Sequence, residues 1–174
     1  MFRSRWSKVL LAIATLVAAS IAFAGWYRVH YSMSVARAFE VNDPHSAQRV
    51  LIATQGSTFK DSLVAEIVGQ LKPRNVYLNV VDISALAAVN DGDWNAIVIV
   101  HTWEMRKPPA DVQAFVERAR NSGKLVALST SGAGSFKIDG IDAISTASVI
   151  DDVPARAAEI VRRVDALLGR KTGE

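Results

Sequence analysis

A strand, a polar loop and an amphipathic helix follow one another between Arg49 and Lys72, and this unit constrains the fold of the rest of the chain. Residues 50–53 form a short apolar run, which is typical of a parallel strand covered on both faces. Between Phe59 and Leu71, apolar residues recur every three or four positions, and Lys60 falls on the polar side of this pattern. The sequence therefore predicts a central strand followed by a helix that packs on the sheet.

The loop between this strand and helix, residues 54–58, has the composition of an anion-binding site. It contains hydroxyl groups and Gly56, whose lack of a side chain lets a ligand approach the backbone. We expect Ser57 or Thr58 to cap the helix, and Thr58 with Asp61 resembles a capping box. Because helix N-termini attract anions, the loop is a candidate phosphate site. The alternative is that both hydroxyls are only helix caps.

The alternation of strand and helix continues to the end of the chain. Further strands are predicted at residues 76–81, 96–100, 125–128 and 141–146, with a short helix after Ser84 and longer helices opened by Pro108 and Asp152. This order predicts an α/β fold with an open, doubly wound, parallel, five-stranded sheet. Such sheets bind ligands beyond the carboxyl ends of their strands. The segments expected to meet there are 54–59, 101–107 and 129–136.

The N-terminal part of the chain differs from the rest. Residues 1–8 are basic, and residues 9–27 are uncharged and would form a helix about 28 Å long, close to the thickness of the hydrocarbon core of a bilayer. We predict a transmembrane anchor at 9–27 whose partner is the lipid bilayer. A signal peptide cleaved after Ala24 stays an alternative, because Ala22-Phe23-Ala24 is a suitable site.

The basic flank also predicts an orientation. With positive residues before the span, we expect the N-terminus in the cytoplasm and the domain on the far side, in the periplasm or another extracytoplasmic space. Residues 28–47 are expected to be a polar tether, and residues 48–170 to be the folded domain.

Charge and cysteine content exclude several function classes. The chain has 20 basic and 17 acidic residues, but four of the basic ones and no acid lie in residues 1–28. The remainder is therefore close to neutral, which argues against a nucleic-acid partner. The absence of cysteine excludes a thiol nucleophile, a disulfide framework and thiolate metal sites.

The three strand-end segments resemble flavodoxin-like domains over the whole folded part. Residues 52–58, IATQGST, resemble the phosphate loop of that family, while 101–104, HTWE, and 129–136 lie where family members clamp the isoalloxazine ring. The resemblance implies strand order 2-1-3-4-5 and FMN as the cofactor. The cofactor-binding residues that it implies are Thr54, Gln55, Gly56, Ser57, Thr58, Phe59, His101, Thr102, Trp103, Ser131 and Gly132.

One element departs from the family pattern. The usual Thr-Gly-Asn-Thr sequence is replaced by Thr58-Phe59-Lys60-Asp61, which puts a bulky residue where the family has glycine. Two functions therefore stay open. The first is a membrane-tethered FMN protein that transfers electrons to a redox partner or to quinone, and the second is a non-catalytic envelope binding module that kept the fold and lost the flavin.

The single aromatic residue that directly follows a central strand, Trp103, separates these two functions. It either stacks on a flavin or packs in the core. His101 and Glu104 lie near each other in sequence without a third candidate ligand, so they predict a structural or cofactor contact and not a metal site. No catalytic residue is predicted.

Overall fold

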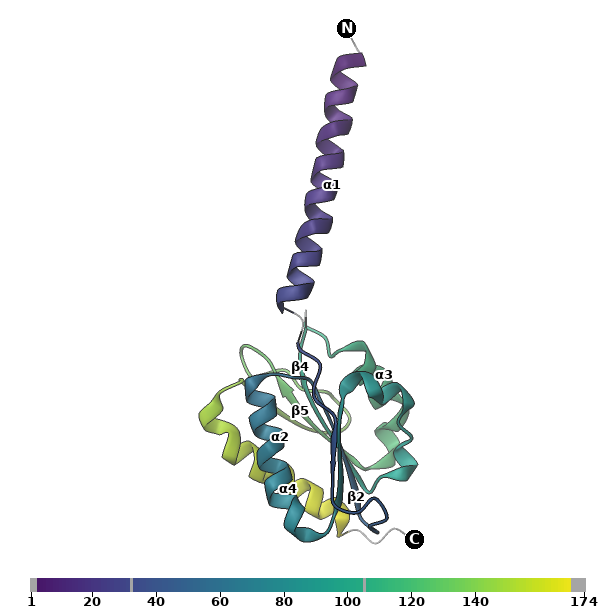
Figure 1. The fold of residues 1–174 in the computed structure, drawn as a ribbon, viewed down its shortest axis with the longest axis vertical. Coiled ribbons are helices and arrows are strands. Elements are labelled where there is room, and N and C mark those ends of the chain that lie inside the picture. Colours follow the sequence, from purple (N-terminus) through teal and green to yellow (C-terminus); the bar gives the residue numbers. More distant parts are fainter. Residues whose placement is uncertain (1–2, 32, 105, 170–174) are drawn as a thin grey trace. The chain divides into compact units, whose positions relative to one another are not determined.

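The computed structural model describes residues 3–31, 33–104 and 106–169 (Figure 1). The chain divides between Met33 and Ser34 into two compact units.

The first unit is a single helix, α1 (Arg3–Tyr31). It extends beyond the predicted span 9–27 at both ends. Its stretch Trp6–Phe23 is long and apolar enough to cross a membrane. By length and composition, α1 therefore suits a bilayer.

The second unit is built on a mixed six-stranded sheet in the order β1-β3-β2-β4-β5-β6. The strands are β1 (Phe39–Val41), β2 (Arg49–Thr54), β3 (Tyr77–Asp82), β4 (Ala96–Thr102), β5 (Leu125–Thr130) and β6 (Asp142–Thr146). The strands β2 to β6 are parallel to one another and follow the predicted order, so the doubly wound parallel α/β sheet is confirmed.

The predicted count of five strands is wrong, because β1 adds an antiparallel edge strand beside β3. This strand lies in the segment that we expected to be a polar tether. Its three residues, Phe39, Glu40 and Val41, are too few to show a period in the sequence.

Helices cover both faces of the sheet (Figure 1). The three longer helices of this unit are α2 (Thr58–Leu71), α3 (Ala110–Ala119) and α4 (Val153–Leu168). Short 3-10 turns lie at Lys72–Arg74, Ile83–Ala88, Asp91–Asp93, Arg120–Ser122 and Ile150–Asp152. The helices α2 and α4 share one apolar core with the sheet, whereas α3 and the turn 83–88 share the other.

The alternation of side chains along β2 explains these two cores. Val50 and Ile52 point into the core under α2 and α4, and Leu51 and Ala53 point into the core under α3. All four are essentially inaccessible to solvent. The strand is therefore covered on both faces, as its continuous apolar run predicts.

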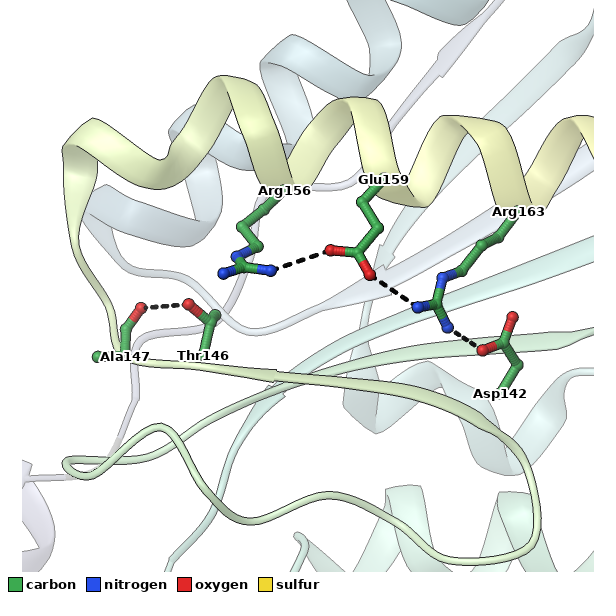
Figure 2. Close-up of polar contacts among 6 residues, drawn as sticks. All are labelled: Asp142, Thr146, Ala147, Arg156, Glu159 and Arg163. Atoms are coloured by element: carbon green, nitrogen blue, oxygen red, sulfur yellow. Dashed lines mark hydrogen bonds and ion pairs between the residues drawn. The ribbon is translucent and has the colours of Figure 1, made fainter.

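A row of ion pairs connects α4 with β6 (Figure 2). Glu159 accepts from Arg156 at 3.0 Å and from Arg163 at 2.7 Å, and Arg163 also pairs with Asp142 at the start of β6. Because these side chains are partly exposed, solvent screens them and each pair adds little stability.

Candidate functional site

The predicted site residues lie at the carboxyl edge of the sheet, where β2, β4 and β5 are neighbours. The loop after β2 leads into α2, the loop after β4 leads into α3, and residues 131–141 connect β5 to β6 without a helix. The strand order therefore brings together the three segments that the sequence singles out.

Residues 34–38, here called the strap, cross this edge. The backbone N–H of Gly56 donates to Ser34 O at 2.7 Å, and Ser34 Oγ donates to Gly56 O at 2.8 Å. Farther along, the N–H of Ala36 donates to Asp82 Oδ2 at 2.8 Å, at the end of β3. The strap is thus bonded to the ends of two neighbouring strands.

Gly56 is required by the strap. A Cβ atom at this position would lie 2.5 Å from Ser34 Oγ, 2.9 Å from Ser34 O and 3.1 Å from Val35 O. The glycine permits a close backbone approach, as the sequence predicts, but the approaching group is another segment of the same chain.

The next three loop residues begin α2. Ser57 is the N-cap, and its Oγ accepts from the N–H of Lys60 at 3.3 Å. The interpretation of Thr58 and Asp61 as a capping box is wrong, because Thr58 is already the first helical residue. Phe59 is only 3% exposed and belongs to the core between α2 and the sheet.

Gln55 links β2 to β4 through its side chain. Its Oε1 accepts from the N–H of Thr102 at 2.7 Å, and its Nε2 donates to Glu104 Oε1 at 3.2 Å. The side chain is almost fully buried. Next to it, Thr54 is also buried and donates its hydroxyl to the carbonyl of Gln55 at 3.0 Å.

Lys60 is a buried cation that sequence analysis missed. Its side chain is 1% exposed, and its Nζ lies 2.7 Å from Thr102 Oγ1, which in turn lies 2.8 Å from Thr130 Oγ1. Burial lowers the pKa of this amine to about 8, while Asp61 and Glu104 oppose the change. The sequence gives no sign of this burial, because the apolar pattern places Lys60 on the polar side of the helix.

His101 is buried in β4 and bonded on both ring nitrogens. Nε2 lies 2.9 Å from Ser129 Oγ, and Nδ1 lies 3.3 Å from Thr102 O. Burial lowers its pKa to about 4, and the charge of Lys60 acts in the same direction. The imidazole is therefore neutral at pH 7, with Nδ1–H donating and Nε2 accepting.

The described residues contain no group of three or more His, Cys, Asp or Glu side chains that could hold a metal ion. The sequence leaves His101 open as a structural residue or a cofactor contact, and the structure shows its ring bonded to Ser129 and Thr102. Its partner Ser129 was not among the predicted site residues, since a serine at a strand end carries no distinctive pattern.

Trp103 connects two of the loops. Its ring centroid lies 5.4 Å from that of Phe136, in the β5–β6 loop, and 6.4 Å from that of His101. The indole Nε1 is buried and has no hydrogen-bond partner among the residues that the structure describes. Trp103 therefore packs against the neighbouring loop and the strand below it.

The two remaining predicted residues lie at the start of the β5–β6 loop. Ser131 Oγ accepts from the N–H of Ser135 at 3.3 Å, and its own N–H donates to Thr146 O at 3.2 Å. Gly132 is exposed, and a Cβ atom there would meet nothing within 4 Å. No close approach requires this glycine.

Comparison with known proteins identifies the fold. No family model and no curated protein matches the chain. Among solved structures, the Flv1 flavodiiron core from Synechocystis matches with a TM-score of 0.51 and 12% identity, over 71% of this chain and 37% of that chain. The domain has a flavodoxin-like fold.

Two other structures are similar at lower scores. Oxidised flavodoxin 2 from Bacillus cereus has a TM-score of 0.45 and 13% identity, over 68% of this chain and 98% of that chain. The flavodiiron protein from Giardia intestinalis has a TM-score of 0.42 and 10% identity, over 68% of this chain and 36% of that chain. This chain therefore spans little more than a third of the length of either flavodiiron protein.

Proposed function

We propose that this chain is a membrane-tethered, flavodoxin-like binding module that works without a flavin. The observation that supports this most strongly is the hydrogen bond from the N–H of Gly56 to Ser34 O. The phosphate loop of a flavodoxin-like domain needs its backbone N–H groups for the ligand. Here the strap takes the N–H of Gly56 and lies against the backbone at that position.

The contact between Trp103 and Phe136 supports the same conclusion. An aromatic ring inserted between two others needs about 7 Å between the outer rings, because each stacked contact occupies about 3.5 Å. The two centroids are 5.4 Å apart. The residues that the resemblance assigns to the phosphate and to the ring thus do not fit FMN in this arrangement.

The polar side chains between these two places are also bonded to one another. Gln55, Lys60 and Thr102 form contacts inside the protein, and His101 is neutral and bonded to Ser129. These contacts stabilise the strand ends and engage the described polar side chains within the protein. A binding role therefore suits the domain better than catalysis.

The membrane anchor is part of the proposal. The helix α1 is suited to a bilayer by length and composition, and we place its N-terminus in the cytoplasm and the domain on the far side of the membrane. A reporter fused to the C-terminus tests this. Activity of a reporter that works only in the cytoplasm would contradict the orientation, and a mature N-terminus at Gly25 would contradict the anchor.

A second candidate function is FMN-dependent electron transfer at the membrane, to quinone or to a redox partner. The fold similarity and the pair of aromatic residues, one from each of the two loops that would clamp the ring, favour it. It requires the strap to leave Gly56 and the Trp103 and Phe136 rings to separate.

An FMN titration of the full-length protein in detergent separates the two functions. The binding-module proposal predicts no tight FMN binding, with no saturable quenching of flavin fluorescence at FMN concentrations below about 1 µM. A flavodoxin of known affinity serves as a positive control for the assay. Saturable, equimolar binding by the tethered protein with a dissociation constant below about 1 µM would support the flavin protein instead.

A further inference from the structure

A groove of about 390 Å³ lies beside Trp103, on the α3 side of the sheet edge. Its walls come from the β4–α3 loop, from α3 and the turn after it, and from the β5–β6 loop. Its volume falls within the range of small-molecule sites. No residue of the strap or of segment 54–59 lines it, so it is separate from the phosphate loop.

Cationic side chains dominate the groove. Arg106, Lys107, Arg120 and Lys137 line it together with only two acidic residues, an excess of two positive charges. Among the described residues, none of these four cations takes part in an ion pair. Positive charges gathered on the walls of a concave site raise the local concentration of anions.

Three arginines elsewhere in the unit do form ion pairs. Arg74 pairs with Asp165, and Arg156 and Arg163 share Glu159. Of the two acids in the groove, Glu117 already accepts from Gln113 Nε2 at 3.0 Å. The positive charge of the groove is thus left for a ligand.

The groove also offers an apolar wall. Trp103, Val116 and Ile138 line it, so a ligand can bury a flat apolar surface beside the cations.

We propose that this groove binds a small organic anion, in which a phosphate or carboxylate group meets the cations and a flat ring packs on the apolar wall. The proposal names a ligand class and a site for the binding module. It rests on the proposed function only in treating the domain as a binder.

Calorimetric titration of the full-length protein in detergent tests this proposal. The probe is adenosine 5′-monophosphate, compared with adenosine, which lacks the anion, and with inorganic phosphate, which lacks the ring. We expect one saturable site for the monophosphate, with affinity at least about tenfold higher than for either comparison probe. Raising the salt from about 0.05 to 0.5 M should weaken binding.

Paired variants locate the site. The double variant Arg120→Gln/Lys137→Gln removes two cations from the groove and should weaken monophosphate binding about fivefold or more. The matched control is Arg162→Gln on α4, which removes an exposed cation outside the groove and should change the affinity less than about twofold. All three side chains are exposed, and circular dichroism checks that the variants fold.

Two results would overturn the proposal. One is no saturable binding of the monophosphate, and the other is an equal loss of affinity in the groove variant and in the control. FMN also carries a phosphate and a flat ring, so its binding is measured in the Arg120→Gln/Lys137→Gln variant as well. FMN binding that this variant weakens lies in the groove, whereas tight FMN binding that it leaves unchanged lies elsewhere and contradicts the proposed function.

Discussion

Ser34 and Gly56, 22 residues apart in the sequence, form two hydrogen bonds: the N–H of Gly56 donates to Ser34 O, and the side-chain Oγ of Ser34 donates to Gly56 O. The contact places the first residues of the second unit on the loop that a flavodoxin-like protein would use for phosphate. The same residues that predict an anion site from sequence therefore hold an internal segment in the structure.

Replacement of Gly56 by alanine should displace the strap. The new Cβ would lie within 2.5 Å of Ser34 Oγ and 2.9 Å of Ser34 O, so one of the two segments must move. We expect a loss of about 1–3 kcal/mol in the free energy of unfolding, typical of overpacking. Denaturant unfolding measures the loss, and faster proteolysis between residues 34 and 38 would show where it arises.

Gly132→Ala is the matched control, because a Cβ atom there meets nothing within 4 Å. It should change the stability by no more than about 0.5 kcal/mol. Equal effects of the two alanine substitutions would show that the strap does not press on Gly56.

His101 should make the domain sensitive to acid. Its pKa is about 4 in the folded state and about 6.5 when unfolded, so the unfolded state binds more protons between these values. Stability should therefore fall as the pH drops from about 6.5 to 4, by up to about 3 kcal/mol. His101→Gln, which removes the titrating group, should show a flatter profile. Identical profiles for both proteins would contradict a buried neutral imidazole.

Lys60 should act at the other end of the pH range. Its pKa is about 8 in the folded state against 10.5 in its ordinary state, so the folded protein loses its proton first. Stability relative to Lys60→Met should rise as the pH increases from about 8 to 10.5, by up to about 3 kcal/mol. Chemical unfolding at several pH values measures the difference. A difference that does not change with pH would mean that the amine reaches solvent.

Trp103 should contribute to stability through its contact with Phe136. Trp103→Ala removes a half-buried indole that packs on Phe136 and His101, and we expect a loss of about 2–3 kcal/mol. Phe136→Ala, which truncates the more exposed ring, should cost less. A Trp103→Ala protein of unchanged stability that loses FMN binding would instead assign the indole to a flavin site.

The sheet could be predicted from the sequence because its central strands are continuous apolar runs. Residues 96–100 and 50–53 are fully buried, as such runs require. The strand β1 and the strap could not be predicted in this way. They are short, lie in a polar segment and depend on contacts with Gly56, Asp82 and β3, which are distant in sequence.

The candidate site was predictable in position but not in chemistry. The predicted loops lie together because each follows a parallel strand, and the carboxyl ends of parallel strands lie at the same edge of the sheet. Sequence patterns did not show that Gln55 and Thr102 bond to each other, or that Lys60 turns inward from a helical position assigned to the polar face. Such partnerships are set by packing between elements and leave no periodic signal.

The central claim, that the strap holds the phosphate loop closed to FMN, can be tested at a single amide. In the full-length, isotope-labelled protein in detergent, the N–H of Gly56 should exchange slowly with solvent, because it donates to Ser34 O at 2.7 Å. Its resonance should stay in place when FMN is added. Fast exchange of this amide, or a saturable shift of its resonance with FMN, would contradict the account.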